Sequence, residues 1–127
     1  MKKIETYKEP RWVKLRQTAL VRDKYTDQYW IRYGKMRNAE IVHHAFPVED
    51  FPQYQYCLWN LVSVSRATHM MLHDRVNNEL TDKGLEILIR TARKNNIDVP
   101  YAYIKEIEMH REENEKRRME SKYRKSV

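Results

Sequence analysis

The stretch that decides the fold is residues 39–75, which read AEIVHHAFPVEDFPQYQYCLWNLVSVSRATHMMLHDR. Its first part, 39–46, is typical of a β-strand, because Ile41 and Val42 are β-branched and Pro47 prevents easy continuation. The sequence therefore predicts a short strand that ends just before this proline.

The remainder of the stretch predicts a loop, a second strand and a helix. Residues 48–56 contain Pro52 and two acidic residues, which favours an ordered loop. Residues 58–64 have the apolar side chains of a short strand, and residues 66–75 contain no proline or glycine and suit a helix. Two strands that are close in sequence most simply pair as a hairpin, so we expect a hairpin followed by a helix.

Four of the five histidines lie in this stretch: His43, His44, His69 and His73. On a helix, a spacing of four residues places His69 and His73 on one face, where two imidazoles can bind one metal ion. His43 and His44 are adjacent on the expected strand, so they point to opposite faces and need different tasks. One can bind metal, and the other can approach substrate where a kink or loop turns it inward. Each pair alone is also common among ordinary surface or partly buried histidines.

The order of these residues (His-His, then a proline, then Asn60-Leu61, then His69 and His73) resembles the HNH endonucleases. Their ββα-metal motif is a two-stranded hairpin packed on a helix, with one ion between them. The segment 12–34, with its Leu15-Arg16 and Arg22-Asp23-Lys24-Tyr25, resembles the lead-in of phage-type members. The resemblance covers roughly residues 10–76. It implies an α+β fold: a ββα-metal hairpin-plus-helix core with flanking helices and a long C-terminal helix.

The resemblance also implies the roles of the site residues. It places His44 as the general base and three histidines as metal ligands: His43, His69 and His73. It places Asn60 as a brace of the loop between the strands or a helper of the metal shell, although an ordinary turn asparagine is the alternative. Arg37 stands where related enzymes carry a phosphate-binding arginine, and Arg32 competes for that role.

One departure from the family is informative. Many phage-type members carry two CxxC pairs that bind a structural zinc, and the corresponding places here hold other residues: Asp27, Trp30, Ser65 and Thr68. A zinc site built on thiolates is excluded at this location, so we expect no structural zinc. Nearby aromatic side chains are the expected replacement that holds the lead-in on the hairpin: Tyr25, Tyr29, Trp30 and Tyr33.

Outside the central stretch, helical spacing of apolar residues predicts a helix over 11–21. Residues 23–38 are expected to form a loop with room for one short strand. Thr81 and Asp82 can cap a further helix that ends near Asn95-Asn96, and residues 102–125 suit a long solvated helix. We therefore expect three parts: an N-terminal arm (1–10), an HNH nuclease domain (11–100) and a charged C-terminal helix (101–127). The basic end of that helix suits either a solvated terminus or a contact with DNA or a partner.

The composition limits the function. The net charge of +7 favours polyanionic partners, although an anionic membrane surface would attract it equally. Two glycines are too few for a phosphate-cradling loop, and no apolar run approaches the length of a membrane span. A single cysteine and no signal-peptide pattern predict a reducing cytoplasm, in a bacterial host cell by the resemblance.

The expected function is a metal-dependent DNA endonuclease with one divalent ion. Three imidazoles favour Zn²⁺, Ni²⁺ or Mn²⁺, whereas the family commonly uses Mg²⁺. The resemblance implies a phage terminase as a partner, and the long helix offers a route to a homodimer. Two alternatives remain: an inactive DNA-binding or packaging protein of the same fold, and a zinc-stabilised hairpin in a protein-interaction module.

Overall fold

A computed structural model describes residues 9–74 and 78–125, with side chains to Lys122. The expected N-terminal arm falls mostly on residues 1–8, which lie outside the described residues. The described chain contains one two-stranded sheet surrounded by helices, which confirms the α+β class. In chain order its elements are α2 (Pro10–Arg22), α3 (Gln28–Ile31), β1 (Ile41–His44), the 3₁₀ turns η1 (Pro52–Tyr54) and η2 (Leu58–Asn60), β2 (Leu61–Val64), α4 (Arg66–Met70), α5 (Asp82–Lys94) and α6 (Tyr101–Lys125).

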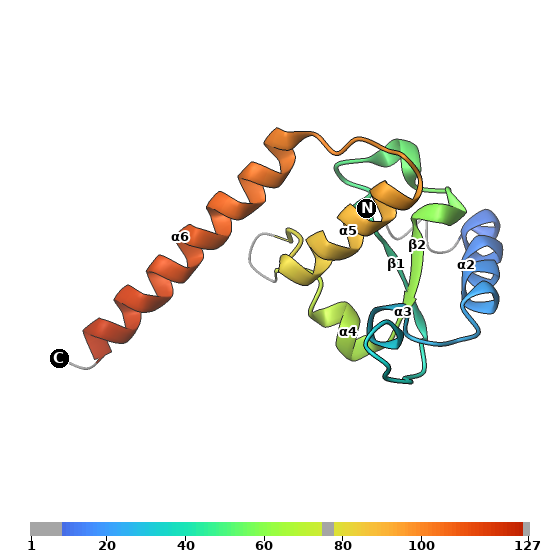
Figure 1. Ribbon diagram of the computed structural model, residues 1–127, viewed down its shortest axis with the longest axis horizontal. Coiled ribbons are helices and arrows are strands. Elements are labelled where there is room, and N and C mark those ends of the chain that lie inside the picture. The colour runs from blue at the N-terminus through green and yellow to red at the C-terminus, as the bar shows by residue number, and fades with distance from the viewer. Residues whose placement is uncertain (1–8, 75–77, 126–127) are drawn as a thin grey trace.

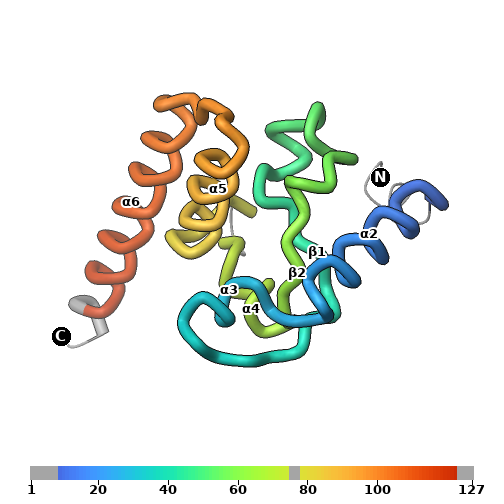
Figure 2. The backbone as a smooth tube through the Cα atoms, turned by 45° about the vertical axis from the view of Figure 1, so that its right-hand side comes forward, coloured from blue at the N-terminus to red at the C-terminus, as the bar shows by residue number. Residues whose placement is uncertain are grey.

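The two strands form the expected antiparallel hairpin, with Ile41 opposite Val64 and His44 opposite Leu61. Both faces are covered: Figures 1 and 2 show α2 on one side of the hairpin and α5 on the other. Alternate residues of β1 therefore enter different cores. Val42 packs in a cluster with α2, and Ile41 packs against the cluster that contains α5.

Helix α5 is the most amphipathic element, and its start follows the predicted capping pattern. The Thr81 hydroxyl accepts a hydrogen bond from the Gly84 amide at 3.3 Å. One face then buries apolar residues in the core, among them Ile87 and Leu88. The segment before α5 lies very close to it, because a Cβ on Gly84 would meet the Leu72 carbonyl oxygen at 2.3 Å. Glycine is required here to let that segment approach the helix.

The predicted loop at 23–38 contains a helical turn, α3, that the sequence analysis missed. The carboxylate of Asp27 caps it by accepting hydrogen bonds from the Tyr29 and Trp30 amides at 2.9 and 3.4 Å. The strands are also shorter than expected, since residues 58–60 form a 3₁₀ turn before β2 begins.

Three of the four places that hold cysteines in many phage-type relatives meet in a buried hydrogen-bond cluster. Asp27 is fully buried and accepts from the Thr68 hydroxyl at 2.6 Å and from the Ser65 amide at 2.9 Å. The Ser65 and Thr68 hydroxyl oxygens lie 3.0 Å apart. Burial alone would raise the pKa of Asp27, but the hydrogen bonds from Thr68 and Ser65 outweigh it and hold the pKa below its usual value. This cluster, together with aromatic packing, ties the lead-in to the end of β2.

The aromatic contribution comes mainly from α3. Tyr29 is buried, and its ring contacts those of Trp30 and Tyr33 at centroid distances of 5.1 and 5.6 Å. Tyr25, which was expected to belong to this group, is 45% exposed. The expectation of aromatic support was therefore incomplete, since it overlooked the polar cluster.

Helix α6 docks on the body near its start and then extends away from it (Figure 1). Ile107 is buried against the core. Three polar contacts follow along the next two turns: His110 with Glu79 at 2.7 Å, Arg111 with Asp82, and Asn114 with Asp74 at 3.3 Å.

The His110–Glu79 contact predicts a pH-dependent docking of α6. The hydrogen bond and the charge of Glu79 raise the pKa of His110 above 6.5, so the folded state favours the charged ring. That contribution is complete below pH 6.5 and is lost as the pH rises through the raised value. We expect His110→Gln to lower the melting temperature at pH 6 and to match the unmodified protein at pH 9. For the control Asn114→Ala, the difference in melting temperature should be the same at both values.

Candidate metal centre

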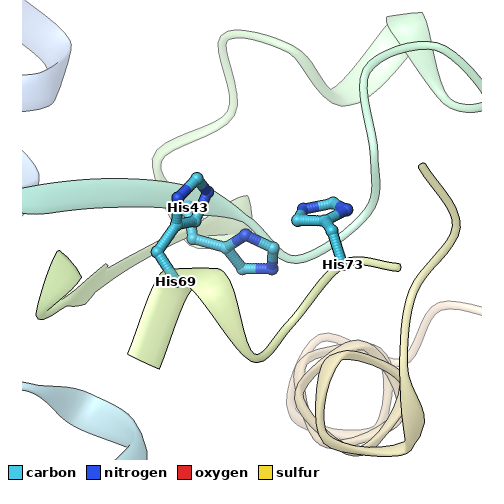
Figure 3. Close-up of side chains that lie close together, drawn as sticks. All are labelled: His43, His69 and His73. Carbon is cyan, nitrogen blue, oxygen red and sulfur yellow. The ribbon is translucent and has the colours of Figure 1, made fainter. Parts of the chain in front are cut away.

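Three histidines from different elements meet beside the hairpin (Figure 3). His43 comes from β1, His69 from α4 and His73 from the segment after α4. One ring nitrogen of each lies within 4.8 Å of the others. The ring centroids are 5.2 to 5.7 Å apart, and none of the rings is stacked on another. The three side chains therefore offer three nitrogen atoms to one point.

His73 does not lie on a helix, which corrects the expectation of a helix over 66–75. Helix α4 ends at Met70, and His73 instead forms an isolated bridge with Leu80. Thr81 provides the reason: its hydroxyl donates to the Met71 carbonyl and its amide donates to the Leu72 carbonyl at 3.0 Å. These contacts replace a further helical turn, while His73 still reaches the other two rings. The final residue of the expected helix, Arg75, lies outside the described residues.

Burial favours the neutral form of two of the three rings, His43 and His69. His43 is 2% exposed, and burial lowers its pKa well below 6.5, with further lowering by His73 and His69. Burial also lowers the pKa of His69. Among the described residues, Nε2 of His43 is buried without a hydrogen-bond partner. Neutral imidazoles with converging lone pairs are the donors that a divalent transition metal prefers, and a buried nitrogen with no partner would gain one from the ion.

His44 lies on the opposite face of β1, where its ring stacks on Trp12 at 4.9 Å between centroids and 20° between planes. Its Nε2 is 3.0 Å from the Gln55 carbonyl oxygen. A carbonyl only accepts, so Nε2 carries the hydrogen and Nδ1 keeps the lone pair in the neutral ring. Burial lowers the pKa of His44, and the Gln55 contact opposes this in part.

The expected kink that turns His44 inward is not observed. His44 remains paired with Leu61 in the strand, so the alternation of the strand and the stack on Trp12 decide its direction. The structure therefore brings His43, His69 and His73 together and leaves His44 beside them on the other side of the strand.

Asn60 is fully buried at the start of β2 and bonds across the loop between the strands. Its Oδ1 accepts from the Phe46 amide at 2.7 Å, and its Nδ2 donates to the carbonyls of Phe46 and Tyr54, each at 3.2 Å. These are the contacts of a brace. They hold the chain just after His43 and His44 in place.

The comparisons agree with this geometry. No protein-family model matches the sequence, and no curated protein matches it significantly. Among solved structures, the chain is similar to the HNH endonuclease of the deep-sea thermophilic bacteriophage GVE2, which was solved with a manganese ion. The identity is 26% and the TM-score 0.53, over 54% of this chain and 75% of that one. The chain shares the HNH endonuclease fold. Its histidine triad fits the metal site of the ββα-metal fold.

The two candidate arginines have different surroundings. Arg37 is exposed and lies over the Trp30 ring at 4.9 Å, while its carbonyl accepts from the Asp27 amide at 2.7 Å. Arg32 is 3.5 Å from Glu86, on α5. Both guanidinium groups lie over aromatic rings, Arg32 over Tyr33 at 5.9 Å, but only Arg32 has an acidic partner among the described residues.

Sequence reasoning missed two neighbours of His44. The apolar spacing that predicts the helix over 11–21 includes Trp12, but it cannot indicate that the ring packs on a histidine 32 residues later. Gln55 contacts His44 through its backbone carbonyl, and a pattern of side chains cannot indicate such a contact. Within the described part of the chain, no helix combines the length and apolarity needed to cross a bilayer.

Proposed function

We propose that this HNH protein is a metal-dependent DNA endonuclease that hydrolyses phosphodiester bonds. The observation that carries the proposal is the convergence of three histidine nitrogen atoms within 4.8 Å, one of them from His43, which directly precedes His44 on β1. The net charge of +7 suits a polyanionic substrate. The similar bacteriophage protein is itself an HNH endonuclease.

His44 is the proposed general base. Its Nδ1 lone pair, left available by the hydrogen bond from Nε2 to Gln55, takes a proton from the attacking water. The lowered pKa keeps the ring neutral at pH 7, which is the form that accepts a proton. The stack on Trp12 holds the ring in one orientation.

His44 and the histidine triad lie on opposite faces of β1, and we propose that they act on the same phosphodiester. Among the described residues, β1 pairs only with β2, so its other edge is not covered by a strand. His43 and His44 project on either side of that edge from Cα atoms about 3.8 Å apart. A phosphodiester that lies along this edge would therefore meet the triad on one side and the base on the other.

His43, His69 and His73 would hold one divalent ion. When bound, such an ion supplies positive charge to the phosphate oxygens and to the leaving oxygen. The candidates are Mg²⁺, Mn²⁺, Ni²⁺ and Zn²⁺. Three nitrogen donors suit the last three by ligand type, and the similar phage enzyme was solved with manganese. We propose no structural zinc, because the corresponding places hold Asp27, Ser65 and Thr68 in place of cysteines.

Two further residues complete the proposed site. Asn60 braces the loop that follows His44 through its bonds to Phe46. Arg37 is the proposed phosphate contact, because its guanidinium is exposed and its position over the Trp30 ring preorganises it. Hydrolysis is expected to leave 5′-phosphate and 3′-hydroxyl ends.

We assign the nuclease to residues 11–100 and propose that it acts in the cytoplasm of a phage-infected bacterial cell. The phage origin of the similar endonuclease supports this setting. A terminase is the proposed partner in that setting, and self-pairing through the C-terminal helix is the proposed route to a homodimer.

The test is incubation of supercoiled plasmid with purified protein in Mg²⁺, Mn²⁺, Ni²⁺ or Zn²⁺. We expect nicking or linearisation with at least one ion and none with EDTA. Because the proposed ion is not needed to hold the lead-in on the hairpin, the helical circular dichroism signal should persist in EDTA. DNA binding without cleavage in any ion would favour the inactive DNA-binding protein, and Zn²⁺ binding without DNA affinity would favour the interaction module.

A further inference from the structure

Helix α6 changes its charge along its length. Residues 101–115 carry five glutamates against Lys105 and Arg111, whereas residues 116–125 carry six lysines and arginines against Glu120. The first half makes the contacts with the body that are described above. The contact between Asn114 and Asp74 is the last of these along the helix. The basic half projects beyond the body (Figure 1).

A cleft of about 1030 Å³ separates this part of α6 from the segment that leads into α5. The α6 wall includes Arg117 and Arg118, and the opposite wall includes Lys83. The acidic residues of the opposite wall are already engaged by α6: Glu79 with His110, Asp82 with Arg111 and Asp74 with Asn114. Over residues 9–74 and 78–122, no ion pair is formed by Arg117 or Arg118. The α6 wall also includes Glu115, so the lining carries five lysines and arginines against four acidic residues and has a small positive excess.

Helical geometry keeps this charge on the cleft side. Arg118 follows Arg111 by seven residues, which is two turns, so it lies on the face that docks against the body. Glu120, nine residues after Arg111, lies on the opposite face. Glu115, four residues after Arg111, lies on the docking face and lines the cleft, so it offsets one of the positive charges there.

We propose that Lys83, Arg117 and Arg118 form a second contact with the phosphodiester backbone of DNA, beside the metal centre. This inference rests on the proposed function for its substrate. Asp74, in the cleft wall, directly follows the triad residue His73, so the cleft begins beside the metal centre and within reach of a duplex bound there. The helix beyond Asn114 extends about 16 Å, which is close to the axial length of five base pairs.

The chemistry of the surface favours DNA over a membrane or a second copy. Met119 and Tyr123 are the only large apolar residues of 116–125. A helix that lies in a membrane interface needs an apolar face, and an interface between copies needs a buried apolar centre. Phosphate groups need neither, because arginine binds them through charge and paired hydrogen bonds.

The test compares two triple variants in binding to a fluorescently labelled 30-base-pair duplex, measured by anisotropy in EDTA at several salt concentrations. The first is Lys83→Gln/Arg117→Gln/Arg118→Gln. The matched control, Lys24→Gln/Lys94→Gln/Lys105→Gln, removes the same charge from exposed positions elsewhere. We expect the first variant to bind roughly ten-fold more weakly and the slope of log K against log salt to fall by about 2 to 3. Far-UV circular dichroism should be unchanged in both, because all six residues lie at the surface.

Equal slopes and affinities in the two variants would overturn the proposal. So would a dimer in sedimentation that only the first variant abolishes, because the surface would then bind a second copy. Plasmid cleavage by the unmodified protein tests the proposed function separately. If the protein cleaved no DNA but the two variants showed the expected difference in slope, the DNA contact proposed here would stand and the proposed nuclease function would be wrong.

Discussion

Replacing His44 with alanine is expected to reduce plasmid cleavage by about 10²- to 10⁴-fold, the usual contribution of a positioned general base. The proton acceptor is lost, while His43, His69 and His73 keep their positions on the other face of β1. We therefore expect Mn²⁺ to bind the His44→Ala variant with nearly unchanged affinity, measured by titration calorimetry. Cleavage and metal binding should separate in this variant.

His69→Ala is the matched comparison. It removes a ligand of the proposed ion, so we expect metal affinity and cleavage to fall together. His69 is only partly buried, and its loss should leave the fold intact by circular dichroism. If His44→Ala cleaved at the original rate, the assignment of the base would be wrong. If His44→Ala lost metal affinity as His69→Ala is expected to do, the assignment of metal binding to one face of β1 and of the base to the other would be wrong.

Replacing Asp27 with alanine is expected to destabilise the protein by about 3 to 5 kcal/mol, the cost of breaking a buried charged network. The change leaves the Thr68 hydroxyl and the Ser65 amide without their acceptor and removes the cap of α3. For a domain of this size the melting temperature should fall by roughly 10 °C or more. Thermal unfolding followed by circular dichroism measures it.

Two further variants locate the origin of the loss. Asp98→Ala removes an exposed carboxylate and should change the melting temperature little. Thr68→Val removes one donor to Asp27, and we expect an intermediate effect of about 1 to 3 kcal/mol. If the Asp27→Ala variant had the same melting temperature as the Asp98→Ala control, aromatic packing alone would hold the lead-in on the hairpin.

Local patterns in the sequence predicted much of this fold. The β-branched pair before Pro47 and the apolar run before Ser65 placed both strands of the hairpin within a few residues. The start of α5 followed from Thr81, and the absence of helix breakers after Pro100 predicted α6. These features depend on neighbours in the chain, so the sequence carries their signal directly. That His43, His69 and His73 lie together was also predictable, from their order and the family resemblance.

The tertiary structure alone decided how those histidines meet. Helical spacing predicted that His69 and His73 share a helix face, yet Thr81 binds the carbonyls that a longer α4 would use. The direction of His44 depends on Trp12, and the replacement of the zinc site depends on Asp27 meeting Thr68, 41 residues away. Such contacts join residues that are distant in the chain. No periodicity encodes them, because burial in a shared core determines which polar groups must pair.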